Sequence, residues 1–181
     1  LALAVIQGAA AAETGTVLVP HVAVYDLSLF SSTGGRGVAA VRGRIAYDFG
    51  GIACEGYSLS FRQVSIVESS EGGGRMSDLR STTFEEGDGS AFRFRQETVG
   101  EAGVPSLVDG RAELRKPDGL IVNVSKPKAE KLTVDGAVAF PSAHMKRLID
   151  AAKAGETTFA VRVFDGSDDG SKIYDTFSVI G

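Results

Sequence analysis

Apolar and polar side chains alternate with a period of two along most of this chain. Successive side chains of a strand point to opposite faces, so this alternation predicts strands with one buried face. In the clearest case, Phe92 and Phe94 alternate with Arg93 and Arg95. The other expected strands carry apolar residues on one parity: Ala23, Tyr25, Leu27 and Leu29; Val41, Ile45, Tyr47 and Phe49; Tyr57, Leu59 and Phe61; Leu120, Val122 and Val124; Phe159, Val161 and Val163; and Ile173, Phe177 and Val179.

Glycine-rich segments such as 72–74 and 87–89 separate these runs and predict short turns. Half-polar strands joined by such turns favour an antiparallel sheet, barrel or sandwich over a parallel sheet covered on both faces. After Phe61 the apolar parity changes to Val64 and Ile66, which predicts a bulge or bend near Gln63.

One amphipathic helix is expected over about 141–154, directly after Phe140. Ser142 is the expected N-cap, and Gly155 stands where a left-handed residue ends many helices. The helix should cover an open end or face of the sheet with one apolar stripe. The stripe consists of Met145, Leu148, Ile149 and Ala152.

The first residues favour export from the cytoplasm. Residues 1–12 are apolar and end in small side chains, which is typical of the end of a secretory signal peptide cleaved near Ala12. This run is too short to span a membrane, for which about 20 residues are needed. We therefore expect a single β-rich domain over residues 13–181 in the periplasm.

Cys54 is the one cysteine of the sequence. In an exported protein an odd cysteine indicates a partner outside the chain or an unpaired thiol, and we favour a disulfide to a residue outside these 181 residues. The chain also stops at Gly181, directly after a strand-like segment. A chain truncated at its C-terminus would account for both observations.

Composition excludes several functional classes. The net charge of −4, with 19 basic and 23 acidic residues, provides no basic surface for nucleic acid. Two histidines and one cysteine offer few metal ligands, and we expect neither a metal nor another cofactor.

Candidate catalytic and ligating residues do not form a recognisable pattern. Residues 165–170 begin like a calcium-binding loop, but Thr176 replaces the carboxylate needed at the twelfth position, so a polar hairpin turn is favoured. No nucleophile elbow accompanies His21 or His144, which we interpret as structural or surface residues. The chain is therefore not expected to be an enzyme.

Several segments together resemble the EipB family, the periplasmic cell-envelope integrity proteins of alphaproteobacteria. The segments are Val19–Leu27, Arg42–Phe49, Cys54–Tyr57, Thr82–Glu85, Phe92–Phe94, Phe140–Lys146 and Phe164–Gly170. The residues singled out in these motifs are His21, Tyr25, Tyr47, Cys54, His144, Met145, Asp165, Asp168 and Asp169.

The resemblance implies a mainly β fold, in which antiparallel strands form an open β-spiral or incomplete barrel with one helix. It also implies a non-enzymatic role in envelope integrity, exerted through binding to a periplasmic protein with tetratricopeptide repeats. Members of the family have a second cysteine near the C-terminus, which the resemblance pairs with the position of Cys54.

An open curl of strands with a helical lid suggests an alternative function, the binding or carriage of a lipid or another apolar ligand on its concave face. The aromatic residues that could line such a pocket could equally fill an ordinary core, which we favour. They are Tyr25, Tyr47, Phe49, Tyr57, Phe61, Phe92 and Phe94.

Overall fold

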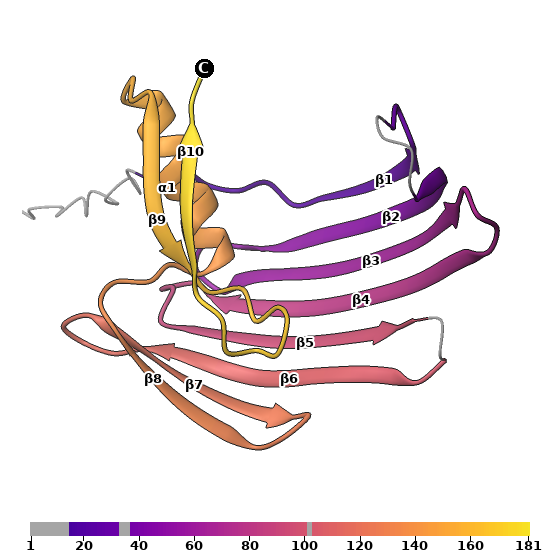
Figure 1. The fold of residues 1–181 in the computed structure, drawn as a ribbon. Coiled ribbons are helices and arrows are strands. Elements are labelled where there is room, and N and C mark those ends of the chain that lie inside the picture. The colour runs from indigo at the N-terminus through magenta and orange to yellow at the C-terminus, as the bar shows by residue number, and fades with distance from the viewer. Residues whose placement is uncertain (1–14, 33–36, 101–102) are drawn as a thin grey trace, which may run out of the picture.

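The computed structural model describes residues 15–32, 37–100 and 103–181 of the chain. Its main element is an eight-stranded sheet in which each strand pairs antiparallel with its neighbour in sequence (Figure 1). The strands are β1 (His21–Ser28), β2 (Val38–Ile52), β3 (Gly56–Ser69), β4 (Gly74–Glu86), β5 (Ala91–Val99), β6 (Pro105–Leu114), β7 (Gly119–Lys126) and β8 (Glu130–Asp135). The signal-peptide segment expected at 1–12 lies outside the described residues.

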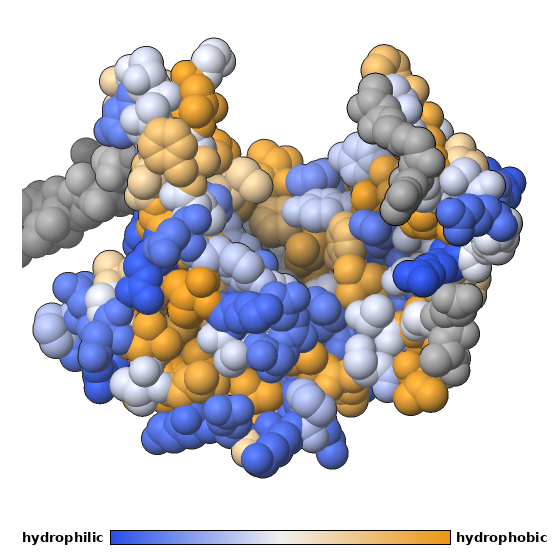
Figure 2. Space-filling model, in the orientation of Figure 1, coloured by the Kyte–Doolittle hydropathy of each residue, from blue (hydrophilic) through white to orange (hydrophobic). Residues whose placement is uncertain are grey.

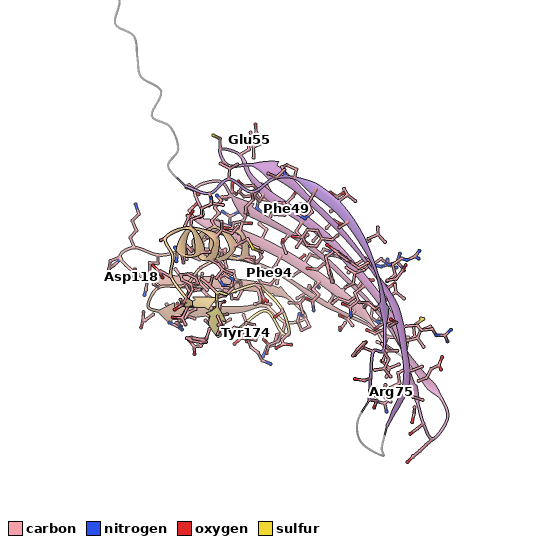
Figure 3. All side chains as sticks on the ribbon, turned by 90° about the horizontal axis from the view of Figure 1, so that it is seen from above. Phe49, Glu55, Arg75, Phe94, Asp118 and Tyr174 are labelled. Carbon is pink, nitrogen blue, oxygen red and sulfur yellow. The ribbon has the colours of Figure 1, made fainter. Side chains whose placement is uncertain are left out.

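The chain then forms helix α1 (Pro141–Lys153) and a second, two-stranded sheet of β9 (Thr158–Val163) and β10 (Tyr174–Val179). Among the described strands, β1 and β8 are the two edges of the large sheet and do not pair with each other. The large sheet curves around α1, which lies on its concave side (Figure 3). The prediction of an open, mainly antiparallel curl with one helix is therefore confirmed.

The hydrophobic core lies on the concave face, over β5, β6 and β7. Phe92, Phe140 and Phe164 are fully buried, and the rings of Phe92 and Phe140 stack with their centroids 5.3 Å apart. The alternation predicted for these strands is confirmed, because Leu120 and Val122 are buried there. The core thus joins the sheet to the segments on either side of α1.

Strands β2, β3 and β4 are 13 to 15 residues long and extend well past this core, toward Arg75 in Figure 3. The bulge predicted near Gln63 is wrong, since Gln63 faces Leu79 in an unbroken register. The parity change falls in the overhang, by which we mean the part of β2–β4 that extends past the core. Neither face of β3 is fully buried there, since Ile66 and Val67, on opposite faces, are each 36% exposed. Without burial, alternation carries no information on the strand's geometry.

The apolar face predicted for the last strand is covered only at Ile173, which lies just before β10 and packs against the core. Phe177 and Val179 are 70% and 78% exposed, whereas Tyr174, Thr176 and Ser178 on the opposite parity are partly covered. β10 belongs to a sheet of two strands, so that only one of its faces meets the rest of the described fold. That face includes Thr176, whose hydroxyl donates to the carbonyl of Val161 at 2.7 Å.

The connection between β9 and β10 packs against Phe94. Gly166 and Gly170 in this loop have positive φ angles and lie so close to the Phe94 ring that neither has room for a side chain. At Gly166 an added Cβ would lie 2.6 Å from Phe94 Cδ2. These two glycines therefore hold the loop on the core.

We expect Gly166→Ala to lower the free energy of unfolding by about 2–4 kcal/mol, because it adds a steric clash to the strain of a positive φ. Gly155→Ala is the matched control, since Gly155 has a φ of +79° with nothing within 4 Å of an added Cβ. It should lose only about 1 kcal/mol in urea unfolding. Equal losses in the two variants would contradict the close packing of the loop.

Candidate functional site

The first turn of α1 is capped by a residue from the sheet. The helix begins after Phe140 without a side-chain cap of its own, so Ser142 is not the N-cap that the sequence predicted. Instead, the carboxylate of Glu85 on β4 accepts the backbone N–H of Ser142 at 2.7 Å and that of Ala143 at 2.9 Å. A helix leaves its first amide groups unpaired, and since Pro141 at the start of α1 has no N–H, Glu85 accepts from the next two, those of Ser142 and Ala143.

Glu85 is 4% exposed, although its neighbour Glu86 is half-buried and pairs with Arg93 across the β4–β5 turn. Burial raises the pKa of the Glu85 carboxyl, while the two amide donors and Lys146 oppose this effect by favouring the charged form. The positive end of the helix dipole acts in the same direction as these donors. Glu85 is therefore a buried carboxylate that holds α1 against the sheet.

An apolar cleft of about 280 Å³ lies beside this contact, between α1 and the concave face of β2–β5. Figure 2 shows a hollow between the raised part formed by α1, β9 and β10 and the opposite end of the sheet, with apolar atoms inside it. The residues that line the cleft are Leu18, Val19, His21, Tyr47, Phe49, Tyr57, Ser58, Leu59, Thr83, Glu85, Phe92, Pro141, Ser142, Met145 and Ile149.

The floor of the cleft is a row of stacked rings on neighbouring strands. His21 stacks on Tyr47 with centroids 5.3 Å apart, and Phe49 stacks on Tyr57 at the same distance. Phe92 continues the floor on β5. Pairing between neighbouring strands produces this row, because His21 on β1 lies opposite Phe49 on β2 and Tyr57 on β3 lies opposite Glu85 on β4.

The structure brings only part of the predicted aromatic set into the cleft, namely Tyr47, Phe49, Tyr57 and Phe92. Tyr25 shares their face, but it lies further along β1 and is 54% exposed. Phe61, opposite Tyr47, is half-buried beside the cleft, and Phe94 belongs to the core beneath the β9–β10 loop. Alternation predicted the correct face but not the position along each strand.

Helix α1 forms the roof of the cleft, and the face that this helix buries differs from the one predicted. Met145 and Ile149 line the cleft, yet Met145 is 49% exposed and Ala152 is exposed. The buried helix residues are Ser142 and Ala151. The predicted apolar stripe thus overhangs an incompletely filled space rather than packing against the sheet.

The segment before β1 covers one side of the cleft with Leu18 and Val19. It is fastened to the last turns of α1, because the Thr16 hydroxyl donates to Asp150 Oδ1 and accepts from the Lys153 ammonium at 2.8 Å. The cleft therefore has three walls that come from the sheet, the helix and the N-terminal segment.

The other motif residues lie away from this cleft. The ring of His144 stacks on Phe159, and burial lowers the pKa of His144, as does the nearby Arg147. Cys54 is exposed in the turn between β2 and β3. Since it is the one cysteine of the sequence, a disulfide would need a cysteine from outside these 181 residues.

The acidic residues of the β9–β10 loop act as hydrogen-bond acceptors within the loop. Asp165 accepts the N–H of Ser167 at 2.9 Å, and Asp169 accepts the N–H of Ser171 at 3.0 Å. Asp168 accepts from Lys172 and from the Tyr174 hydroxyl, at 2.8 and 2.7 Å. This loop joins two antiparallel strands, as predicted, although it is longer than a tight turn.

Within residues 15–32, 37–100 and 103–181, no three His, Cys, Asp or Glu side chains gather so that they could hold a metal ion. The single helix of that part of the chain is not long and apolar enough to cross a membrane.

An open antiparallel sheet curled around one helix, with an apolar cleft between them, defines a barrel-like protein that has not closed. The chain belongs to the EipB-like family, whose characteristic sequence pattern it matches over residues 12–181. The resemblance drawn from the sequence motifs is therefore confirmed.

A similar sequence and a similar solved structure both come from Brucella abortus. Over 175 residues the chain is 40% identical to the cell envelope integrity protein EipB, covering 96% of this chain and 61% of the relative's length. The crystal structure of a beta-barrel-like protein with a domain of unknown function superposes with a TM-score of 0.84. Its sequence is 39% identical, and the match covers 90% of this chain and 68% of that one.

We expect Glu85→Ala to lower the free energy of unfolding by about 2–3 kcal/mol, because the buried N–H of Ser142 and the partly buried N–H of Ala143 lose their acceptor. Glu86→Gln on the neighbouring surface should cost less than about 0.5 kcal/mol. Urea unfolding measures both. Comparable losses would mean that Glu85 does not anchor α1.

The pH dependence provides a second test of Glu85. Its folded-state pKa is raised above the ordinary 4.5, so the folded chain binds the proton more tightly than the unfolded chain. The stability of the native protein relative to Glu85→Gln should therefore fall as the pH rises from about 4.5 toward neutrality. A difference that is constant or that grows with pH would contradict this assignment.

Proposed function

We propose that this chain contributes to cell-envelope integrity in the periplasm as a non-enzymatic binding protein. The name of its Brucella relative supports the envelope role. The observation that supports a binding function is the apolar cleft. Both oxygens of its buried carboxylate, Glu85, already accept hydrogen bonds from backbone amides of α1. Such a carboxylate fastens the walls of a binding site and is not available as a general base.

The first binding event is with another protein. The resemblance to the family implies a periplasmic protein with tetratricopeptide repeats as the partner. The outer edge of β1 offers a docking surface, because no other described strand pairs with it. Exposed apolar side chains lie along this strand, and Val22 and Val24 are 73% and 61% exposed. Open edges of this kind accept a partner's extended segment.

We expect the double substitution Val22→Glu and Val24→Glu to weaken binding to a purified periplasmic tetratricopeptide-repeat protein of the same organism at least tenfold. The matched control is Thr133→Glu on β8, the opposite edge of the sheet, which should leave the affinity within about twofold. Surface-immobilised binding measurements compare the three proteins. Equal weakening by both changes, or no binding to the native chain, would contradict this proposal.

A second binding event, with an apolar ligand, is favoured by the cleft itself. Its rings and aliphatic roof form a preformed apolar space that opens to solvent on one side (Figure 2). Pockets of this composition bind apolar molecules, with a few polar groups that fix their orientation. The carriage or binding of a lipid or a similar molecule is therefore the alternative function.

We expect an uncharged naphthylamine dye to bind the native chain with a rise in fluorescence. Met145→Glu should weaken that binding at least tenfold, since it places a charge in the apolar cleft. Ala152→Glu adds the same charge to an exposed position of the same helix and should leave dye binding unchanged. Unaltered dye binding by Met145→Glu would place the dye elsewhere on the protein.

A further inference from the structure

The outer edge of β1 carries almost no protection against pairing with another strand. No other described strand pairs with it there (Figure 1). Its one acidic or strongly basic side chain, Asp26, already accepts a hydrogen bond from Arg44 of β2 at 2.8 Å. Sheet edges are usually guarded by charges, prolines or bulges. The opposite edge, β8, is guarded in this way, because charged residues stand at Glu130, Lys131 and Asp135.

The hydrogen bonds between β1 and β2 fix which backbone groups of β1 point to the open side. The N–H of Leu29 donates to the carbonyl of Val41 at 3.1 Å, in the register that pairs the two strands. In an antiparallel ladder, residues that exchange hydrogen bonds with one neighbouring strand alternate with residues whose N–H and C=O point the other way. The N–H and C=O groups of Val22 and Val24 therefore point to the open edge.

The sequence of β1 is complementary to itself in one antiparallel register. When Ala23 lies on a two-fold axis, Val22 lies opposite Val24 of the second copy, and Val24 lies opposite Val22 of the second copy. Both valines have outward-pointing backbone groups, so each of these pairs can exchange two hydrogen bonds. Val22 and Val24 are 73% and 61% exposed in the single chain, and this pairing covers both.

On the concave face the same register pairs one ring with another. His21 lies opposite Tyr25 of the second copy, and Tyr25 is 54% exposed in the single chain. His21 is the outer end of the row of stacked rings, with its centroid 5.3 Å from that of Tyr47. A second copy would therefore continue this row across the interface, and cross-strand aromatic pairs of this kind stabilise a sheet.

The neighbouring registers are less favourable. A shift in one direction places Val22 opposite Asp26 of the second copy, and a shift in the other places Val24 opposite Pro20, which has no N–H to donate. In the register centred on Ala23, the two Asp26 residues lie about six residues apart along the paired strands, which is about 20 Å. The like charges of the two copies are therefore kept apart.

We propose that the outer edge of β1 pairs with β1 of a second copy of this chain, antiparallel and centred on Ala23. The two large sheets then form one continuous sheet, and neither β1 edge is left open. The periplasmic partner proposed above uses the same edge, so it must displace the second copy before it binds. This inference goes beyond the proposed function, because it states what covers the edge when that partner is absent.

Disulfide trapping tests the register directly, in a chain whose own cysteine is removed by Cys54→Ser. Residues that lie opposite each other at a site without ladder hydrogen bonds have Cα atoms about 4.5 Å apart, which suits a disulfide bond. Ala23→Cys should therefore link two chains in a glutathione redox buffer. Tyr25→Cys is the matched control, because its two copies lie about four residues apart, about 13 Å, and its yield of linked dimer should be at least tenfold lower. Mass spectrometry without reductant measures both yields.

A second substitution and a second method complete the test. Adding Val22→Glu and Val24→Glu to Ala23→Cys should lower the yield at least tenfold, because glutamates then face each other across the interface. Sedimentation equilibrium of the unsubstituted chain should show self-association that increases with concentration. Equal yields from Ala23→Cys and Tyr25→Cys, or a monomer at every concentration, would overturn the dimer. If the periplasmic partner still bound in that case, the proposed function would stand and only this inference would fall.

Discussion

The contact between the Glu85 carboxylate and the first turn of α1 is the interaction on which the cleft depends. The helix has no side-chain cap of its own, and the concave face presents one buried carboxylate. Only when they meet are the charge and both amides satisfied. The strand neighbours of Glu85 are Tyr57 and Phe92, so the same contact that fixes α1 also sets its distance from the aromatic floor.

Alternation predicted the fold well wherever one face of a strand is buried. Strand β5 is such a case, because Phe92 and Phe94 are buried in the core while Arg93 and Arg95 on the opposite parity are exposed. The same reasoning was wrong at Gln63 and at Phe177 because these residues lie on the overhang and on a two-stranded sheet. Apolar residues there are not selected by burial within the described fold.

The candidate site was predictable only in part. Parity placed Tyr47, Phe49 and Tyr57 on a shared face, but it could not place Tyr25 outside the cleft or Phe94 in the core. Glu85 was not predicted, because a glutamate next to Glu86 and a glycine-rich turn has the sequence context of a solvent-exposed charge. Its partners come 57 and 58 residues later, and no local pattern connects a strand carboxylate to a distant helix terminus.

The order of the strands has a consequence for the way the chain folds. Each strand of the large sheet pairs with its neighbours in sequence, so the sheet can grow one hairpin at a time at little cost in loop entropy. The cleft instead requires Glu85 to reach α1, and Thr16 to reach Asp150 across 134 residues. We therefore expect the cleft to be the last part of the described fold to form, with its row of aromatic rings exposed until the helix packs onto the sheet.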